Sequence, residues 1–504
     1  MQKIFIPGQF EQDWVRMFTH LANLFFEQSK IVVEDQKDAL TIEMNVRKDS
    51  GNVLLANAQL VYASTVYEAS FSEKELLDAP EIEQSRQLKR VYSHVFLEVL
   101  EQFTDTKQSW GILTGIRPMK LYHKYRQLGY DSEGITELLM KNHRISKEKA
   151  DLLATIEQVQ LQAIPDLHNI QEEVSIYIGI PFCPTKCAYC TFPAYAIHRK
   201  NGRVESFLDG LHEEIREIGK WLTKRDKKIT TIYFGGGTPT SIEAEEMDAL
   251  YNTMYESFPY MKEVREVTVE AGRPDTITPE KIDVLKKWDI DRISVNPQSY
   301  TDETLKAIGR HHSVQETVDK FWLSRNMGMK NINMDLIIGL PNEGLHEFQH
   351  SLNETEKMQP ESLTVHTLSF KTASEMTRNK DKYKVAGRET AEQMMQLGEQ
   401  WTKENGYMPY YLYRQKNILG NLENVGYAKP GEESLYNIII MEEVQSIIGL
   451  GCGASSKFMD PVTGKLTQFQ NPKDPAAYIL TFEEYIDKKI EHLEKIFPEV
   501  VQID

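Results

Sequence analysis

The sequence predicts an α/β protein whose central domain, residues 170–370, is a partial barrel of six parallel strands and their helices, a (β/α)6 arrangement. Two observations predict this fold class. From Val174 onward, short β-branched runs alternate with amphipathic helical segments, as in a parallel sheet built from strand–helix–strand units. Before this region, a different pattern predicts a separate α+β domain over 1–165, and a mixed α/β extension follows over 371–504.

The first domain, 1–165, shows an alternating pattern and then a helical one. An apolar strand is expected over 3–6 and a helix over about 11–28. Two segments with a period of two, 39–46 and 53–61, predict a small antiparallel sheet. Apolar residues at helical spacing then predict three helices, at 84–105, 118–128 and 146–162. No residue of this domain indicates its role.

The central domain contains six candidate strands rich in β-branched residues. They are 174–180, 229–234, 264–270, 292–296, 332–338 and 362–366. The helices between them have recognisable starts, such as Thr278 followed by Pro279 at the first helical position. In a barrel of parallel strands, the loops at the carboxyl ends of the strands converge on one face. Functional residues are therefore expected at these ends.

Three of the four cysteines lie within eight residues, directly after the first of these strands. Cys183, Cys187 and Cys190 have the spacing C-x3-C-x2-C, and three thiolates on one loop can bind three irons of a cubane cluster and leave the fourth iron open. The alternatives are a zinc knuckle or a redox dithiol. Zinc sites usually pair C-x2-C units or add histidine, and Cys452 lies far downstream, so the spacing favours an iron–sulfur cluster.

Three glycines, Gly235, Gly236 and Gly237, follow the second strand and precede Thr238. A turn without side chains lets the backbone approach a polar ligand closely, although a tight turn alone would also explain the pattern. Beside a cysteine loop one strand away, a ligand that bridges the loop and the cluster is the better interpretation. S-adenosylmethionine suits it, because its amine and carboxylate can chelate the open iron.

Other polar residues follow the remaining strands at the same face. Glu270 and Asp335 can accept hydrogen bonds from a ribose, and Arg310 can pair with a methionine carboxylate through two hydrogen bonds. Gln298 follows the fourth strand. Each would more often be a solvated surface charge if it stood alone, but their shared position favours a binding site. His366 ends the sixth strand, near where a substrate would lie, and His311 and His312 are expected at the surface beside Arg310.

Composition restricts the class of partner. The net charge of −17 and pI of about 5.4 argue against a protein that coats nucleic acid or an anionic membrane, although a local basic pocket can serve an acidic substrate. The sequence starts without a charged segment followed by an apolar run, and no stretch approaches the roughly 18 apolar residues of a membrane span. Clustered cysteines fit a reducing compartment. We therefore expect a cytoplasmic protein without membrane insertion.

In order along the chain, these motifs resemble those of the radical S-adenosylmethionine (SAM) superfamily. The segments 177–183, 269–271, 295–299 and 335–341 further resemble the oxygen-independent coproporphyrinogen III oxidase family, also called coproporphyrinogen dehydrogenases. The resemblance covers residues 174 to about 370, and more loosely the part through Gly453. It implies a radical SAM core barrel, with the extension over 371–504 covering the substrate.

Carried over position by position, the resemblance implies that Cys183, Cys187 and Cys190 bind a [4Fe–4S] cluster and are essential to catalysis. It implies S-adenosylmethionine contacts from the following residues: Tyr177, Tyr189, Gly235, Gly236, Gly237, Thr238, Glu270, Gln298, Arg310 and Asp335. In this chemistry the cluster gives one electron to the sulfonium and a 5′-deoxyadenosyl radical takes hydrogen from the substrate. The implied reaction of heme biosynthesis is the oxidative decarboxylation of coproporphyrinogen III propionates toward protoporphyrinogen IX. It needs a low-potential electron donor and an electron acceptor, which the sequence does not identify.

Two departures from the family pattern leave a second role open. The oxidases usually have a further cysteine where this chain has Phe192 and a histidine where it has Gly179. Related heme carriers also lack that cysteine, which makes a heme-binding, chaperone-like protein the main alternative, beside a radical enzyme that acts on another tetrapyrrole. Those carriers tend to show His-Asn followed by Tyr-Trp, and the nearest stretch here begins Tyr436-Asn437. The sequence therefore favours an enzyme.

Overall fold

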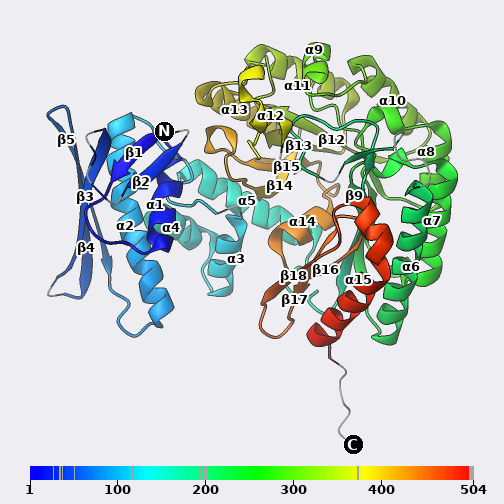
Figure 1. The fold of residues 1–504 in the computed structure, drawn as a ribbon, viewed down its shortest axis with the longest axis horizontal. Coiled ribbons are helices and arrows are strands. Elements are labelled where there is room, and N and C mark those ends of the chain that lie inside the picture. The colour runs from blue at the N-terminus through cyan, green and yellow to red at the C-terminus, as the bar shows by residue number, and fades with distance from the viewer. Residues whose placement is uncertain are drawn as a thin grey trace, which may run out of the picture. The chain divides into compact units, whose positions relative to one another are not determined.

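A computed structural model describes residues 1–498 except 27, 33, 35, 37, 50, 116, 193, 198–202, 372 and 373. The chain divides into two compact units, Met1–Thr155 and Ile156–Asp504 (Figure 1). Of the helices in the described part of the chain, none combines the length and the apolar character needed to cross a membrane.

The first unit is built on a five-stranded sheet with the order β2-β1-β3-β4-β5. Its strands are β1 (Gln2–Phe5), β2 (Ser29–Val32), β3 (Ala39–Lys48), β4 (Val53–Tyr62) and β5 (Thr65–Lys74). The prediction of a small antiparallel sheet from 39–46 and 53–61 is confirmed, because β3, β4 and β5 pair antiparallel, whereas β1 pairs in parallel with β2 and β3, which was not predicted. The helix α1 (Gln12–Ala22) connects β1 to β2, and such a crossover permits parallel pairing.

Helices cover this sheet and follow it along the chain. The alternating residues of β4 and the helix α2 (Glu81–Thr104) share one apolar core with Phe18 of α1. The predicted helices correspond to α2, α3 (Met119–Gln127) and α5 (Lys147–Ala163), whereas β5 and α4 (Ser132–His143) were not predicted. The division between the units falls within α5.

The second unit confirms the six predicted parallel strands. They are β6 (Val174–Ile180), β9 (Ile229–Gly236), β10 (Glu266–Val269), β11 (Arg292–Ser294), β12 (Asn331–Ile338) and β13 (Ser362–Thr367). Each pairs in parallel with the next. The connecting helices are α6 (Arg203–Lys224), α7 (Ala244–Ser257), α8 (Pro279–Lys287), α9 (Asp302–Ala307), α10 (Val314–Asn326) and α11 (Leu345–Met358). As predicted, Thr278 caps α8 and accepts a hydrogen bond from the backbone of Lys281.

The residues after 371 extend the same sheet rather than forming a separate unit. β16 (Ser446–Gly451) pairs in parallel with β6 and continues into β17 (Ser455–Met459) and β18 (Leu466–Gln470). At the other edge, β15 (Asn424–Ala428) pairs antiparallel with β13 and with β14 (Met408–Tyr413). These strands satisfy backbone groups that an open parallel sheet would leave unpaired. Among the described residues the sheet has eleven strands and does not close.

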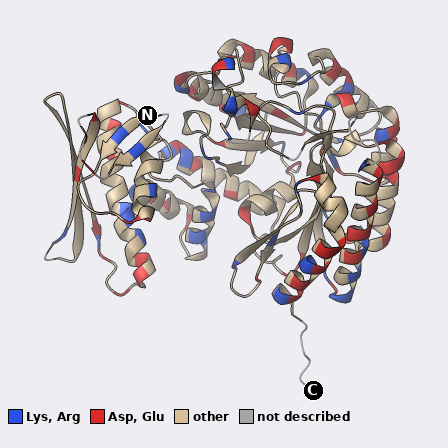
Figure 2. Cartoon of the chain, viewed as in Figure 1, with Lys and Arg blue, Asp and Glu red and all other residues tan. Residues whose placement is uncertain are grey.

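The remaining elements surround this sheet. A two-stranded ladder joins β7 (Phe182–Cys183) to β8 (Tyr195–Ala196), and three further helices are α12 (Glu375–Arg378), α13 (Arg388–Glu404) and α14 (Leu435–Glu442). The last helix, α15 (Pro475–Ile496), packs against α6. Charged residues concentrate on the helices, whereas the central strands are almost free of them (Figure 2).

A buried ion pair joins α6, α15 and β16. Lys489 contacts Glu214 and donates to the carbonyl of Gly449, and neither Lys489 nor Glu214 is more than 1% exposed. Tyr478 also donates to Glu214 at 2.7 Å, as does the backbone N–H of Gly451. Because every charge here has a partner, the network fixes β16 beside the first barrel strand.

Candidate active site

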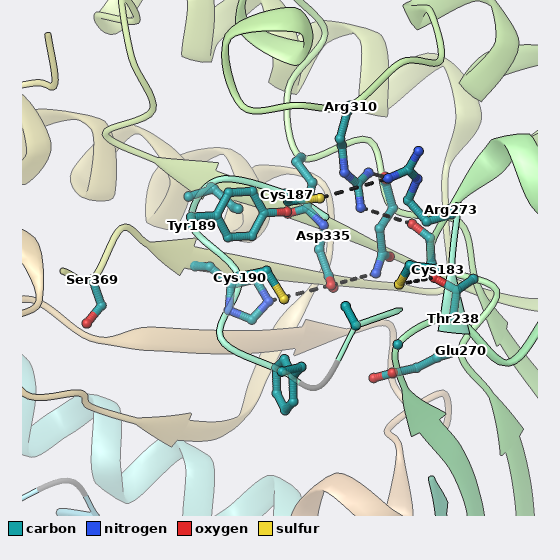
Figure 3. Close-up of a pocket in the computed structure, with 18 of the residues that line it drawn as sticks. Cys183, Cys187, Tyr189, Cys190, Thr238, Glu270, Arg273, Arg310, Asp335 and Ser369 are labelled. Carbon is teal, nitrogen blue, oxygen red and sulfur yellow. Dashed lines mark hydrogen bonds and ion pairs between the residues drawn. The ribbon is translucent and has the colours of Figure 1, made fainter. Parts of the chain in front are cut away.

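A cavity of about 230 Å³ lies at the carboxyl ends of the parallel strands. Most residues singled out from the sequence line it: Cys183, Cys187, Tyr189, Cys190, Gly236, Gly237, Thr238, Glu270, Gln298, Arg310, Asp335 and His366. In the close-up, the three cysteines lie around the same part of the cavity (Figure 3). Two predicted residues, Tyr177 and Gly235, are not among those that line it.

The cysteine loop is held against the neighbouring strand. Sγ of Cys183 lies 3.3 Å from Oγ1 of Thr238, and the N–H of Cys190 donates to the carbonyl of Cys187 at 3.1 Å. Burial raises the pKa of the Cys183 thiol to about 11, with a smaller opposing effect from Thr238. Binding of iron must therefore displace a proton from this thiol.

The placement of the donors fits a cluster. In the described part of the chain, no three His, Cys, Asp or Glu side chains are placed to bind one metal ion together. A cubane does not need such a group, because each of its irons takes a single thiolate. Three separate cysteines around one cavity therefore match a [4Fe–4S] cluster.

The glycine run brings two backbones together. A Cβ on Gly237 would lie 2.5 Å from the carbonyl oxygen of Phe182, and the N–H of Thr238 donates to the same oxygen at 2.8 Å. Gly236 has a φ of 109°, which favours glycine. The missing side chains thus allow the turn to seat Thr238 beside Cys183 and leave Gly236 and Gly237 at the cavity.

Gly235 serves a different purpose, because it makes room for aromatic rings behind Glu270. A Cβ on Gly235 would lie 3.0–3.1 Å from Glu270, Tyr233 and Tyr177. The rings of Tyr177 and Tyr233 are stacked with centroids 6.2 Å apart, and Tyr233 donates a hydrogen bond to Glu270. Tyr177 therefore lies in a layer of aromatic side chains that supports Glu270.

Asp335 lies on β12 in a network of polar side chains. Asn296 donates to its Oδ2 at 2.7 Å and Asn333 to its Oδ1 at 2.8 Å, and Nε2 of His366 lies 3.6 Å from Oδ2. Burial is the largest single effect and would raise the pKa of Asp335, but His366, Asn333 and Thr364 together outweigh it and hold the pKa below its usual value. Asp335 is thus kept as a carboxylate, and Tyr413, 3.3 Å from Nδ1 of His366, extends the network.

Arg310 and Gln298 leave buried polar atoms for a ligand. Arg310 is 5% exposed and donates to the carbonyl oxygens of Asn296 and Gly272, while its Nε has no hydrogen-bond partner among the described residues. Gln298 has a φ of 66° and its buried Oε1 is likewise without a described partner. Buried polar atoms without a hydrogen-bond partner cost free energy unless a ligand satisfies them. A positive φ at a residue other than glycine, as at Gln298, is typical of a binding site.

The structure adds residues that the sequence did not single out. Arg273, Asn296, Lys371 and Tyr413 all line the cavity. The segment Gly272-Arg273 comes two residues after Glu270, so its place after a parallel strand was the available signal. One prediction was wrong: His312 is only 3% exposed, because the turn after α9 folds it beneath Arg310, whereas His311 is exposed as expected.

Comparisons with known proteins show the family of the chain. Residues 177–355 match the model of the radical SAM superfamily. The chain is 58% identical over 496 residues to the oxygen-independent coproporphyrinogen-III oxidase-like protein HemZ of Bacillus subtilis, covering 98% of each protein. It is 30% identical over 283 residues to the heme chaperone HemW of the same organism, covering 56% of this chain and 70% of that protein.

The solved structure of coproporphyrinogen III oxidase (HemN) from Escherichia coli is similar in fold. The TM-score is 0.50 at 19% identity, and the match covers 65% of this chain and 72% of that chain. The fold and the three-cysteine site thus define a radical SAM protein. The chain belongs to the oxygen-independent coproporphyrinogen III oxidase-like family of that superfamily, and its cofactors are a [4Fe–4S] cluster and S-adenosylmethionine.

Proposed function

We propose that this protein catalyses the oxygen-independent oxidative decarboxylation of coproporphyrinogen III propionates toward protoporphyrinogen IX. The observation that carries the proposal is one cavity lined by three cysteines, two carboxylates and buried cations. When bound, the cluster and S-adenosylmethionine supply hydrogen-atom abstraction, and the protein supplies position and exclusion of water. An external low-potential donor and an electron acceptor complete the reaction.

In this proposal Cys183, Cys187 and Cys190 are the cluster ligands and the other lining residues bind S-adenosylmethionine. Glu270 and Asp335 accept hydrogen bonds from its hydroxyl and amino groups, and Gln298 and Arg310 use their unpartnered atoms on its polar groups. Four more residues are assigned to S-adenosylmethionine because they line the same cavity: Gly236, Gly237, Thr238 and Tyr189. Tyr177 and Gly235 act indirectly, by supporting Glu270.

The rest of the cavity suits an anionic substrate. Four further polar residues also line the cavity: Lys371, Gln415, Tyr413 and His366. A porphyrinogen carries propionate groups, and Lys371 offers the cation that such a carboxylate requires in a chain with a net charge of −17. His366 offers a second polar contact, to a propionate or a pyrrole.

A heme-binding role is the second candidate, and two observations favour it. The HemW relative is named as a heme chaperone. Phe192, which stands where the family's oxidases usually have a further cysteine, is 57% exposed and lines the cavity. An exposed aromatic ring at the mouth can pack on a tetrapyrrole without reacting with it. A radical reaction on another tetrapyrrole would use the same arrangement.

The deciding experiment is anaerobic cluster reconstitution followed by reduction with S-adenosylmethionine, with and without coproporphyrinogen III. The products to measure are 5′-deoxyadenosine and the tetrapyrrole mass. Loss of two carboxyl groups supports the oxidase, whereas nucleoside formation without a tetrapyrrole change indicates another substrate. Stoichiometric heme binding without turnover would replace the proposal by the carrier role.

A further inference from the structure

Arg273 lies directly behind the cysteine loop, at the carboxyl end of β10. It is 2% exposed, and its Nη1 donates to Oγ1 of Thr185 at 3.0 Å and to the Thr185 carbonyl at 3.3 Å. The same Nη1 lies 4.0 Å from Sγ of Cys187 (Figure 3). One buried guanidinium therefore contacts both the backbone of the cysteine loop and one of its sulfur atoms.

Asp275 fixes the orientation of this guanidinium. Nε of Arg273 donates to Oδ1 of Asp275 at 3.0 Å and Nη2 donates to Oδ2 at 2.8 Å. Two parallel hydrogen bonds set both the position and the plane of the arginine. The carbonyl of Arg273 accepts a hydrogen bond from Thr276 at 2.7 Å, and Thr276 contacts Thr240 of the glycine-run turn at 2.7 Å. The arginine is thus anchored from two sides.

Asp275 is the carboxylate that pairs with Arg273, at 2.8 Å. Burial lowers the pKa of His312 most, and together with the positive charges of Arg310 and Arg273 it brings this pKa to about 3, so the ring is neutral. Arg310 is a second positively charged side chain that lines the same cavity as Arg273. Asp275, whose Oδ1 lies 3.9 Å from Nδ1 of His312, is the carboxylate of the group.

We propose that Arg273 is a positioning residue that holds the Thr185–Cys187 turn in its binding conformation and raises the reduction potential of the cluster. This inference rests on the proposed ligand role of Cys187. One electron from an external low-potential donor makes the cluster more negative by one charge, and no proton moves, because arginine stays protonated throughout. A fixed positive charge and a hydrogen bond near a cluster sulfur stabilise the reduced state.

Three variants and a matched control can separate the effect of the positive charge of Arg273 from the effect of its hydrogen bonds to the cysteine loop. Arg273→Gln removes the charge, Arg273→Lys keeps it without the planar fork, and Asp275→Asn removes the neighbouring negative charge. The control is Arg265→Gln, because Arg265 makes the same two-bond pair with Asp166, at 2.7 Å for each bond, but at the opposite end of β10. Each reconstituted protein is titrated with dithionite while the reduced cluster is followed by electron paramagnetic resonance, and iron loss to a chelator is timed.

The expected shifts have opposite signs. Arg273→Gln moves the midpoint potential to a more negative value, Asp275→Asn moves it to a less negative one, and Arg265→Gln leaves it unchanged. The chelator removes iron from Arg273→Gln about 10-fold faster than from the wild type, the lower end of the effect usual for outer-shell partners. Arg273→Lys keeps a midpoint potential close to that of the wild type, because the charge remains. It still loses iron faster than the wild type, because the planar fork is gone.

Shifts of the same sign in Arg273→Gln and Asp275→Asn, or potentials equal to that of Arg265→Gln, would overturn the proposal. Should Arg273→Gln not fold, the comparison of Arg273→Lys with Asp275→Asn decides. The test uses no tetrapyrrole, so it fails or succeeds independently of the decarboxylase proposal.

Discussion

Tyr233 donates its hydroxyl hydrogen to Glu270 across two adjacent parallel strands. Glu270 follows β10 at the cavity while Tyr233 lies within β9, so the carboxyl group has aromatic rings on its buried side. Burial raises the pKa of Glu270 to about 7, and the hydrogen bond from Tyr233 limits the rise. The charge of this site therefore changes near neutral pH.

Binding of S-adenosylmethionine should strengthen as the pH rises through about 7, because only the ionised Glu270 is a full acceptor for ligand hydroxyl groups. Glu270→Gln should bind more weakly and lose this pH dependence. Equilibrium dialysis under anaerobic conditions measures both. The matched control is Glu343→Gln, since burial also raises the pKa of Glu343 to about 7, but Glu343 contacts Ser299 outside the cavity lining. Equal pH profiles in wild type and Glu270→Gln would contradict the assignment.

The contribution of Glu343 to the stability of the protein should fall as the pH rises from about 4.5 to about 7. Over that range the native Glu343 keeps a proton that the unfolded chain releases, because burial raises its folded pKa from 4.5 to about 7. When the native state binds more protons than the unfolded state, the free energy of unfolding falls as the pH rises. For a single group, this contribution is lost as the pH rises through the pKa of the folded state. Glu343→Gln should reduce this pH dependence in urea unfolding. An unchanged slope would show that Glu343 is not protonated in the folded state.

Gly237→Ala should disrupt the contact between the glycine run and the cysteine loop. The new Cβ would lie 2.5 Å from the Phe182 carbonyl oxygen, which belongs to the backbone and cannot rotate away. Overpacking of this kind costs about 1–3 kcal/mol, and iron retention should fall with it. Gly398→Ala is the control. Gly398 lies within α13, and a Cβ there would lie 3.5 Å from Phe348, which is an ordinary contact distance. Thermal unfolding and iron analysis should separate the two, and a Gly237→Ala protein with normal iron content would argue against a tight approach.

Replacing Cys187 with alanine should abolish reductive cleavage of S-adenosylmethionine, since the cluster would lose one of three ligands. Cys452→Ala should retain iron and cleavage, because Cys452 is buried beside Gly179 on β6 and does not line the cavity. Iron analysis and 5′-deoxyadenosine formation report on both variants. A fully active Cys187→Ala protein would remove every enzymatic interpretation.

Lys489→Met should destabilise the second unit strongly, because it leaves the carboxylate of Glu214 buried without its cation. Breaking a buried ion pair from one side costs about 3–5 kcal/mol, whereas replacing both partners by uncharged groups costs less. The double variant Glu214→Gln with Lys489→Met should therefore recover much of the loss in urea unfolding. If the double variant were as unstable as the single one, the pairing of the two charges would not be the cause.

The parallel strands could be predicted because a strand buried on both faces has a continuous β-branched run, which is a local property of the sequence. The same reasoning places Glu270, Gln298 and Asp335 at one face from the sequence alone. It could not place β16, since pairing with β6 joins residues far apart in the chain and no local pattern specifies that neighbour. The mixed pairing of β1 was missed for the same reason.

By itself, the sequence determined the order of the six central parallel strands, the cysteine spacing and therefore the family of cofactors, because these depend on local patterns. Only the tertiary structure decided which polar groups reach the cavity. Arg273 contacts Cys187, and His312 is buried beneath Arg310, because separate loops converge at one end of the sheet. Their charges and hydrogen bonds are set by neighbours distant in the chain, and the chemistry of the site depends on that convergence.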